Sequence, residues 1–488
     1  MEDDESIDEL RQKALCHECI GEEYLAAEVR KEGQDRTCSY CGKKGQSYTI
    51  EEMAQRVGLA FEQHFTRTSD QPTSLQYSML SDRESTYDWE RDGEPVVSAI
   101  EDAAQIPEQA AIDIQAILDD EHGDFESAAM GEETEFSSET YYDAKGSNDF
   151  EWQEEWRYFE RSLKTEARFF SRNAAAHLAS VFKDIDKMST IDGTPLVIDA
   201  GPDAALRAVF RARVFQSEDK LVEALCRPDL HLGSPPSFFA VAGRMNARGI
   251  SVFYGANEPS VAVAEVRPPV GSKVTVARFD IIRPLRLLDL TALSKIVEYG
   301  SVFDPKWAAR LERATFLRSL GQRITKAVMP DDEAFEYLPT QAVADFLATE
   351  NDPTVDGIAF PSVQADGDGL NVVLFHKASR VEVIEIPRGA TIEASTGYNT
   401  EDGWEAEYSV TEEVPPHNSA QEKDAVDHWP NFEDFIGATQ NVDSSEFRNA
   451  TLRIDVTSVM VHAIRKVQYL SDEHTVRRHR WEKRDPKF

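Results

Sequence analysis

Residues 242–268 read AGRMNARGISVFYGANEPSVAVAEVRP, and this stretch decides the interpretation of the fold. Turn-forming residues surround Arg244, a strand-like run leads into Tyr254, and the run PSVAVAEV has the composition of a short helix that carries Glu265. A cation, an aromatic ring and a carboxylate thus come from three adjoining elements, and we expect them to converge on one cleft. By residue type alone they are also compatible with ordinary polar surface, because charged side chains are mostly exposed.

Strand-like and helix-like runs continue after this stretch. The apolar runs typical of strands are SVFYG (251–255), KVTVARFDI (273–281), LRLLDL (285–290), GIAFPS (357–362) and NVVLFH (371–376). Two stretches between them are helical in composition, TFLRSLGQRITKAV (315–328) and LPTQAVADFLATE (338–350). This mixture predicts an α+β domain over residues 201–390.

The same region resembles the RES domain, a family named after its Arg, Glu and Ser residues. The resemblance rests on the order GRMNxxGIxxFYG followed by AEVRP, and on VTVARFDIIRPLRLLDLT (274–291), YLPTQAVADFLA (337–348) and DGIAFPSVQADGDGLNVVLF (356–375). The family's Ser falls on Ser362, and its early Arg falls most readily on Arg213, although Arg211 is two residues away and the sequence does not separate them. Many members have GGRWN, where this chain has Ala242 and Met245 in place of the first Gly and the Trp.

The resemblance implies an ADP-ribosyltransferase-like fold and an NAD⁺-degrading enzyme. Such an enzyme would cleave the nicotinamide glycosidic bond, either as an NAD⁺ phosphorylase or as an NAD⁺ glycohydrolase, and would act as the toxin of a toxin–antitoxin or defence system with an antitoxin protein as partner. Two alternatives remain open at this point. One is an ADP-ribosyltransferase that modifies a macromolecule, and the other is a non-catalytic interaction protein that binds through a zinc ribbon.

NAD⁺ offers a diphosphate, an aromatic ring and a positive charge at the glycosidic nitrogen, and the residues can be matched to these groups. Arg244 would grip the diphosphate with a bidentate fork. Tyr254 would stack on nicotinamide or ribose, and Glu265 would stabilise the oxocarbenium-like charge as nicotinamide leaves. The expected catalytic residues are therefore Glu265, Arg244 and Tyr254, and the expected substrate-binding residues are Arg213, Ser362 and Asn246.

Four of the five cysteines form two close pairs near the N-terminus. Cys16 and Cys19 are followed, after eighteen residues, by Cys38 and Cys41, a spacing typical of a zinc ribbon. Four thiolates would close the coordination shell of a structural Zn²⁺ and leave no position for a catalytic water. Surface thiols, two disulfides, or replacement of one thiolate by His17 are the alternatives. This region also resembles the HEPN/RES N-terminal segment that precedes RES domains in longer proteins.

The charge of the chain argues against several classes of partner. Asp and Glu number 89 against 52 Lys and Arg, which gives a formal net charge of −37, the wrong sign for general nucleic-acid binding. No run approaches the roughly 18 apolar residues of a membrane span, and the N-terminus lacks the features of a secretory signal. We therefore expect a soluble, acidic, cytoplasmic protein that does not bind membranes.

The acidic residues are concentrated in the middle of the chain, since residues 81–160 carry 25 acidic and four basic residues. Composition and periodicity together predict six segments. They are a zinc-ribbon-bearing N-terminal segment (1–70), an acidic linker with a short helix from about Ile106 (71–150), a helical region (151–200), the RES domain (201–390), a second acidic linker (391–446), and a C-terminal strand with a basic tail (447–488).

Overall fold

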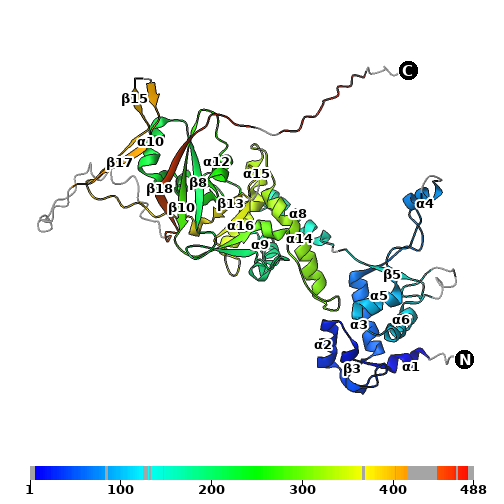
Figure 1. Cartoon of the computed structure of the whole chain (residues 1–488). Helices are drawn as coiled ribbons and strands as arrows, with labels where there is room; N and C mark the ends of the chain where they lie inside the picture. The colour runs from blue at the N-terminus through cyan, green and yellow to red at the C-terminus, as the bar shows by residue number, and fades with distance from the viewer. Residues whose placement is uncertain are drawn as a thin grey trace, which may run out of the picture. The chain divides into compact units, whose positions relative to one another are not determined.

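The computed structural model describes residues 6–82, 86–124, 130, 133–146, 148–364, 369–401, 403–415, 448–468 and 471–481. The chain divides into two compact units. Unit 1 contains residues 1–159, 189–194 and 293–320, and unit 2 contains residues 160–188, 195–292 and 321–488. Both are mixtures of helix and sheet (Figure 1).

Unit 1 combines helices with two small antiparallel sheets. Among the described residues, the helices that lie wholly in unit 1 are α1 (Ile7–Gln12), α2 (Glu23–Glu32), α3 (Ile50–His64), α4 (Ser74–Ser81), α5 (Val96–Ala104) and α6 (Glu108–His122). One sheet has the order β1-β3-β2, from Ala14–Cys16, Lys44–Thr49 and Gln34–Thr37. The other has the order β4-β6-β5, from Phe65–Arg67, Tyr141–Ala144 and Glu94–Pro95.

The core of unit 1 includes a region that the sequence analysis assigned to an acidic linker. The short helix expected near Ile106 is α6, but α5 precedes it, and both helices bury their apolar faces in one cluster with α3. Val96 and Ile100 on α5 and Ile114 on α6 are fully buried. Residues 94–122 therefore form part of a folded unit, because helical spacing of apolar residues gives these acidic helices a buried face.

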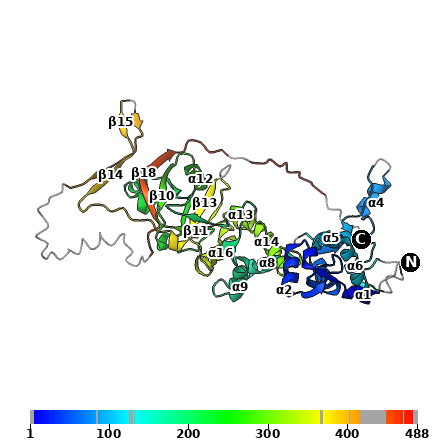
Figure 2. The same cartoon turned by 60° about the horizontal axis from the view of Figure 1, so that its bottom comes forward.

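Unit 2 is built on an eight-stranded sheet of order β18-β10-β8-β9-β13-β12-β11-β7. The strands are β7 (Val197–Ala200), β8 (Ala208–Phe215), β9 (Phe253–Ala256), β10 (Lys273–Ile281), β11 (Leu285–Asp289), β12 (Gly357–Pro361), β13 (Leu370–Leu374) and β18 (Leu452–Ala463). All neighbours are antiparallel except β11 and β12. Figure 1 and Figure 2 show strands β18 and β10 side by side.

Helices cover this sheet, and strand alternation explains how. On β10, Val274 and Val276 face the short helix α12 (Pro259–Glu265), whereas Phe279 and Ile281 belong to a second cluster that contains residues of α10. The helices that lie wholly in unit 2 are α9 (Arg172–Val181), α10 (Glu218–Cys226), α11 (Pro228–His231), α12, α15 (Glu333–Glu336) and α16 (Leu338–Thr349). Helices α8 (Phe150–Thr165), α13 (Leu290–Leu293) and α14 (Trp307–Thr325) each have residues in both units. The helical region expected over residues 151–200 is thus a pair of helices followed by β7.

The sheet is weakly joined at one point. Strands β8 and β9 share a single residue pair, Phe210 with Ala256, whereas β8 and β10 pair over eight residues and β9 and β13 over four. The sheet therefore consists of two well-paired halves that meet at a short contact. Residues on either side of this contact can line a hollow that a continuous ladder would close.

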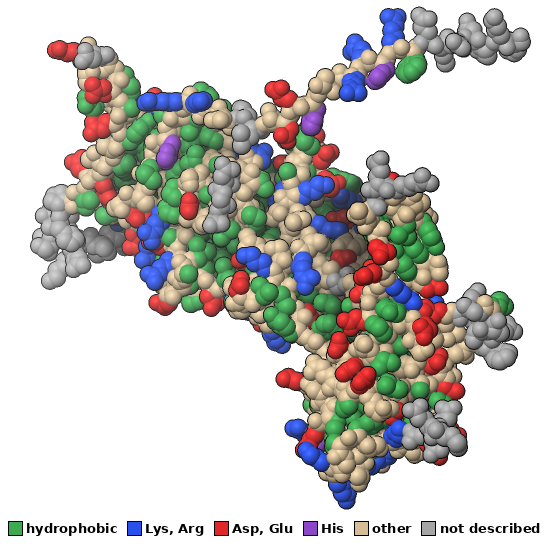
Figure 3. Space-filling view, turned by 45° about the vertical axis from the view of Figure 1, so that its right-hand side comes forward, with side chains coloured by type: hydrophobic (Ala, Val, Ile, Leu, Met, Phe, Trp, Pro, Cys, Tyr) green, Lys and Arg blue, Asp and Glu red, His purple; other side chains and the backbone are tan. Residues whose placement is uncertain are grey.

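The segments after residue 390 differ from the expected linker. Strands β14 (Thr391–Ser395) and β17 (Ser409–Glu413) pair, as do β15 (Tyr398–Thr400) and β16 (Gly403–Glu405). The rest of the expected linker, 416–446, lies outside the described residues. The C-terminal strand is β18, and basic side chains follow it in the segment that leads to the C-terminus (Figure 3).

Among the described residues, no helix combines the length and the apolar character that crossing a membrane requires.

Candidate functional site

A cavity of about 420 Å³ lies in unit 2, at the point where β8 and β9 diverge. Its size falls within the usual range for small-molecule sites. The charged and aromatic residues that line it are Arg211, Arg244, Arg267, Glu265, Glu333, Phe210, Tyr254, Tyr337 and Phe360. Three arginines against two glutamates make the wall cationic, in a chain whose formal net charge is −37.

Glu265 is the last residue of α12 and reaches the cavity from that end of the helix. Its Oε1 atom accepts hydrogen bonds from Ser362 Oγ at 2.5 Å and from Asn371 Nδ2 at 2.8 Å. Ser362 directly follows β12, and Asn371 lies on β13. Three separate elements therefore fix one carboxylate, and the structure brings the predicted Glu265 and Ser362 together.

Arg244 lines the same cavity and is held from two sides. Its Nη1 atom donates to the carbonyl oxygen of Ile324 at 2.7 Å, and its guanidinium lies 4.9 Å from the centre of the Tyr337 ring. Thr340 Oγ1 donates to its carbonyl oxygen at 2.6 Å. Only Nη1 is engaged among the described contacts of this side chain, so its other N–H groups can bind an anion.

Tyr254 lies on β9 and lines the cavity, but its hydroxyl organises the neighbouring turn. The hydroxyl accepts from the backbone N–H of Met245 at 3.0 Å and donates to Asn246 Oδ1 at 2.9 Å. Burial raises the pKa of Tyr254 to about 12, so the phenol is protonated at neutral pH. A Cβ added at Gly243 would lie 2.7 Å from this hydroxyl oxygen, which explains why glycine occupies that position.

The prediction that Asn246 binds substrate is not supported. Asn246 is 3% exposed, and its Nδ2 atom donates to the carbonyl oxygens of Val241, Ala247 and Ile250. Its Oδ1 accepts a hydrogen bond from the Tyr254 hydroxyl, so both the nitrogen and the oxygen of the amide are hydrogen-bonded within the protein. Asn246 therefore holds the loop that carries Arg244, and it does not line the cavity.

The two candidates for the early arginine lie in different surroundings. Arg213 is exposed, donates through Nη1 to the carbonyl oxygen of His231 at 2.5 Å, and is not among the cavity residues. Arg211 lines the cavity, with its guanidinium 4.9 Å from the centre of the Phe253 ring. Its Nη1 atom is buried and has no hydrogen-bond partner among the described residues. Desolvation, with a smaller effect of Arg213, lowers the pKa of Arg211 to about 10, so it stays charged at neutral pH.

Five polar residues that line the cavity were not predicted from the sequence, namely Asn371, Tyr337, Glu333, Arg267 and Thr325. Asn371 gave a usable signal, since an asparagine beginning an apolar strand run is unusual in a strand. Tyr337 and Glu333 are joined by a hydrogen bond of 3.1 Å from the Tyr337 hydroxyl to Glu333 Oε1. Both lie in or beside a four-residue helix, α15, for which no periodicity could be read.

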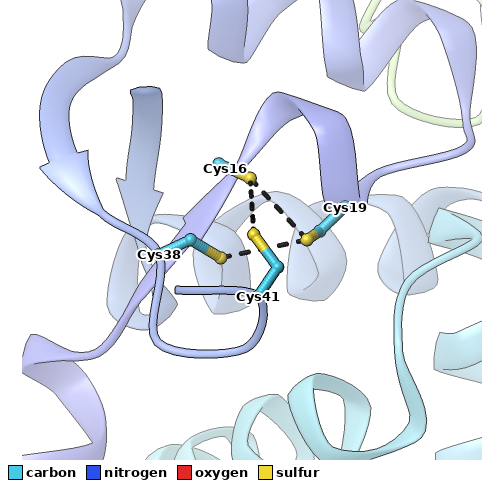
Figure 4. A group of neighbouring side chains, drawn as sticks. All are labelled: Cys16, Cys19, Cys38 and Cys41. Atoms are coloured by element: carbon cyan, nitrogen blue, oxygen red, sulfur yellow. Dashed lines mark hydrogen bonds between the residues drawn. The ribbon is translucent and has the colours of Figure 1, made fainter. Parts of the chain in front are cut away.

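The four paired cysteines form a second site, in unit 1 (Figure 4). Cys16 and Cys19 lie at the ends of β1 and of a 3₁₀ turn, and Cys38 and Cys41 lie in the β2–β3 connection. Gly42 completes this connection with φ of +71°. The four sulfur atoms lie within 4.8 Å of one another, with Sγ–Sγ distances of 3.6 Å from Cys16 to Cys19 and to Cys41.

These distances distinguish a pair of disulfides from a metal site. A disulfide needs an S–S distance of about 2.05 Å, so the described thiols are free. Tetrahedral zinc with Zn–S bonds of about 2.3 Å places the sulfurs about 3.8 Å apart, and the distances Cys16–Cys19, Cys16–Cys41 and Cys19–Cys38 of 3.6 to 3.9 Å agree with this. His17 is not a member of the group. The four cysteines could therefore hold one metal ion.

Comparison with known proteins gives one match. The family model described as the RES domain matches residues 224–394, which include α12 with Glu265, strand β9 with Tyr254, and Ser362. No curated protein and no solved structure matches the chain. Strand β8, with Arg211, precedes the matched residues, so its place beside the site comes from the structure alone. The chain contains a RES domain.

Proposed function

We propose that this protein is an NAD⁺-degrading enzyme that cleaves the bond between nicotinamide and ribose in the cavity of its RES domain. One observation carries the proposal: a carboxylate fixed by two hydrogen bonds faces a cavity whose wall also presents arginines and tyrosines. A dinucleotide with a diphosphate, a flat ring and a cationic glycosidic nitrogen matches each of these groups.

The chain's own residues supply binding, orientation and charge. Arg244 and Arg211 bind the diphosphate, because charged hydrogen bonds to phosphate oxygens are strong and Arg211 has an unpaired buried donor. The rings of Tyr254 and Tyr337 offer faces to nicotinamide or ribose. Glu265 accepts a hydrogen bond from a ribose hydroxyl and stabilises the positive charge that develops on C1′.

The bond changes balance without an oxidant or reductant. The C1′–N bond breaks, its electron pair leaves with nicotinamide, and the ring becomes neutral. An oxygen of water or of inorganic phosphate forms the new bond to C1′, and its proton passes to solvent. Water gives ADP-ribose, whereas phosphate gives a phosphorylated ADP-ribose.

Zn²⁺ is the metal that we propose for Cys16, Cys19, Cys38 and Cys41, in a structural role. Four thiolates leave no open coordination position, so such an ion would supply folding energy and no bond-breaking chemistry. A role as a toxin, with an antitoxin protein as partner in the cytoplasm, completes the proposal on the strength of the RES domain.

Consumption of NAD⁺ by the purified full chain tests the activity directly. We expect loss of NAD⁺ with equal release of nicotinamide, and a chromatographic separation of the products with and without inorganic phosphate identifies the acceptor. A rate that rises with phosphate indicates phosphorolysis, and an unchanged rate indicates hydrolysis. Stable transfer of label from NAD⁺ to macromolecules of a lysate would instead favour the ADP-ribosyltransferase, and absence of any turnover would favour an interaction protein.

The two arginines of β8 give a matched pair of variants. Arg211→Ala is expected to raise KM for NAD⁺ by about 10- to 100-fold, because a buried charged donor to the diphosphate is lost. Arg213→Ala, two residues along the same strand, should raise it far less, since that side chain donates to a carbonyl oxygen away from the cavity. Steady-state kinetics measures the KM for NAD⁺ of both variants. A larger increase for Arg213→Ala than for Arg211→Ala would assign the binding role to Arg213 instead.

A further inference from the structure

Asn371 holds an unusual position for an amide side chain. It is 7% exposed, in a strand paired on both sides, opposite Ala256 of β9 and Phe360 of β12. Residues directly opposite one another in a sheet share a face, and both of these partners line the cavity. A buried amide in the middle of a sheet is costly in free energy unless it is hydrogen-bonded. The one described side-chain hydrogen bond of Asn371 is therefore the interaction that explains why an asparagine occupies this position.

That contact is the bond from Asn371 Nδ2 to Glu265 Oε1 at 2.8 Å. An ionised carboxylate only accepts hydrogen bonds, so the amide must present its NH₂ group and not its oxygen to Glu265. Ser362 Oγ donates to the same oxygen at 2.5 Å. Among the described residues, no hydrogen bond reaches Glu265 Oε2. One carboxylate oxygen is thus held by the protein and the other is left for a ligand.

We propose that Asn371 is a positioning residue for the reaction: with Ser362 it fixes Glu265 through Oε1 and leaves Oε2 to meet the ribose of the substrate. This inference rests on the proposed function. It changes the role expected for Ser362 from contact with the substrate to contact with the carboxylate. It also predicts that Asn371 acts on the chemical step more than on binding.

Asn371→Asp tests the proposal with almost no change in shape, because it replaces the donor by a second carboxylate. We expect kcat to fall about 10- to 100-fold while KM changes less than about threefold. The acidic limb of the kcat/KM profile should move to higher pH, since two adjacent carboxylates share a proton. The other charged and titratable groups of the cavity are the same in both proteins, namely Arg211, Arg244, Arg267, Glu333, Tyr254 and Tyr337.

The matched control is Asn399→Asp, which adds the same charge to an exposed strand residue on β15 and should leave kcat, KM and the pH limb unchanged. If Asn371→Asp does not fold, Asn371→Ala removes the donor without adding a charge, and kcat should fall again with KM nearly constant. A folded Asn371 variant with the kcat and the pH limb of the unaltered protein would overturn the proposal, as would a change confined to KM.

A second measurement does not depend on turnover. In Asn371→Asp the carboxyl pair binds a proton more tightly in the folded state than in the unfolded chain, so the variant loses stability as the pH rises. Its melting temperature, relative to that of the unaltered protein, should therefore be lowest at pH 8 and should recover toward pH 5. Adding Glu265→Gln should reduce this pH dependence to the part that burial of the new carboxyl group causes by itself. Absence of turnover in the unaltered protein refutes the proposed function alone, whereas a pH dependence of melting that Glu265→Gln leaves unchanged refutes the contact between Asn371 and Glu265.

Discussion

Replacing Glu265 by glutamine is expected to lower kcat/KM for NAD⁺ by about a thousandfold. The substitution keeps the size of the side chain and an oxygen that can accept from Ser362 and Asn371. What it removes is the negative charge that, in the proposed mechanism, stabilises C1′ as nicotinamide leaves. The effect should therefore fall mainly on kcat, which nicotinamide release over a range of NAD⁺ concentrations measures.

Glu258→Gln is the control for this experiment. Glu258 is the exposed N-cap residue of α12, seven residues before Glu265, and does not line the cavity. Its variant should turn over NAD⁺ at the unaltered rate, and both variants should melt at similar temperatures. A folded Glu265→Gln protein with substantial turnover would show that the charge of this carboxylate is not needed, and would remove the basis of the proposed mechanism.

Local pattern was sufficient to predict the elements whose residues line the cavity. Strand β10 has the bounds that its alternating run predicted, and Arg244, Tyr254 and Glu265 line one cavity as expected from their three adjoining elements. These predictions succeeded because each depends on a turn, a strand or a helix of fewer than ten residues. Such elements are specified by residues that are close in sequence.

The choice between Arg211 and Arg213 depended on long-range pairing and could not be made from sequence. Side chains two residues apart on a strand share a face, so both arginines satisfy the same pattern. The distinction arises because β8 and β9 pair only at Phe210 and Ala256, which opens the sheet beside Arg211. The role of Asn371 was hidden for the same reason, since Glu265 lies 106 positions away in the chain.

Net charge misled the prediction for residues 94–122. The region is acidic, but its charges lie on helices whose other faces carry Val96, Ile100, Ile114 and Ile117, all fully buried. Burial of an apolar face stabilises a helix through the area removed from water, and exposed carboxylates oppose this only weakly. Composition therefore predicted a linker, whereas spacing correctly predicted the helix from about Ile106, which is α6, and was not applied to α5.

Removal of the metal proposed for the four cysteines is expected to have the largest effect on stability. Cys38→Ser should leave the purified chain without its equimolar zinc and should destabilise unit 1 by about 5 kcal/mol or more, because metal-binding free energy is folding free energy at such sites. Cys16 and Cys38 are 2% and 1% exposed and belong to the core cluster that also contains Ile50 and Ile100. Loss of the ion would leave four unligated thiols at the edge of that core, and β1 would remain joined to the β2–β3 connection through the hydrogen bonds between Ala14 and Ser39.

Metal analysis and thermal unfolding measure the two effects, and the fifth cysteine provides the control. Cys226 lies on α10 in unit 2, and its Sγ donates to the carbonyl oxygen of Ile392 at 3.7 Å, outside the four-cysteine group. Cys226→Ser should keep the metal and the unfolding transition of unit 1. Two results would contradict the proposed metal site: an unaltered chain that contains no zinc, or a Cys38→Ser variant with the same melting temperature as the unaltered chain. The four thiols would then stabilise the ribbon without a metal, and the sulfur–sulfur distances of 3.6 to 3.9 Å would have a purely structural origin.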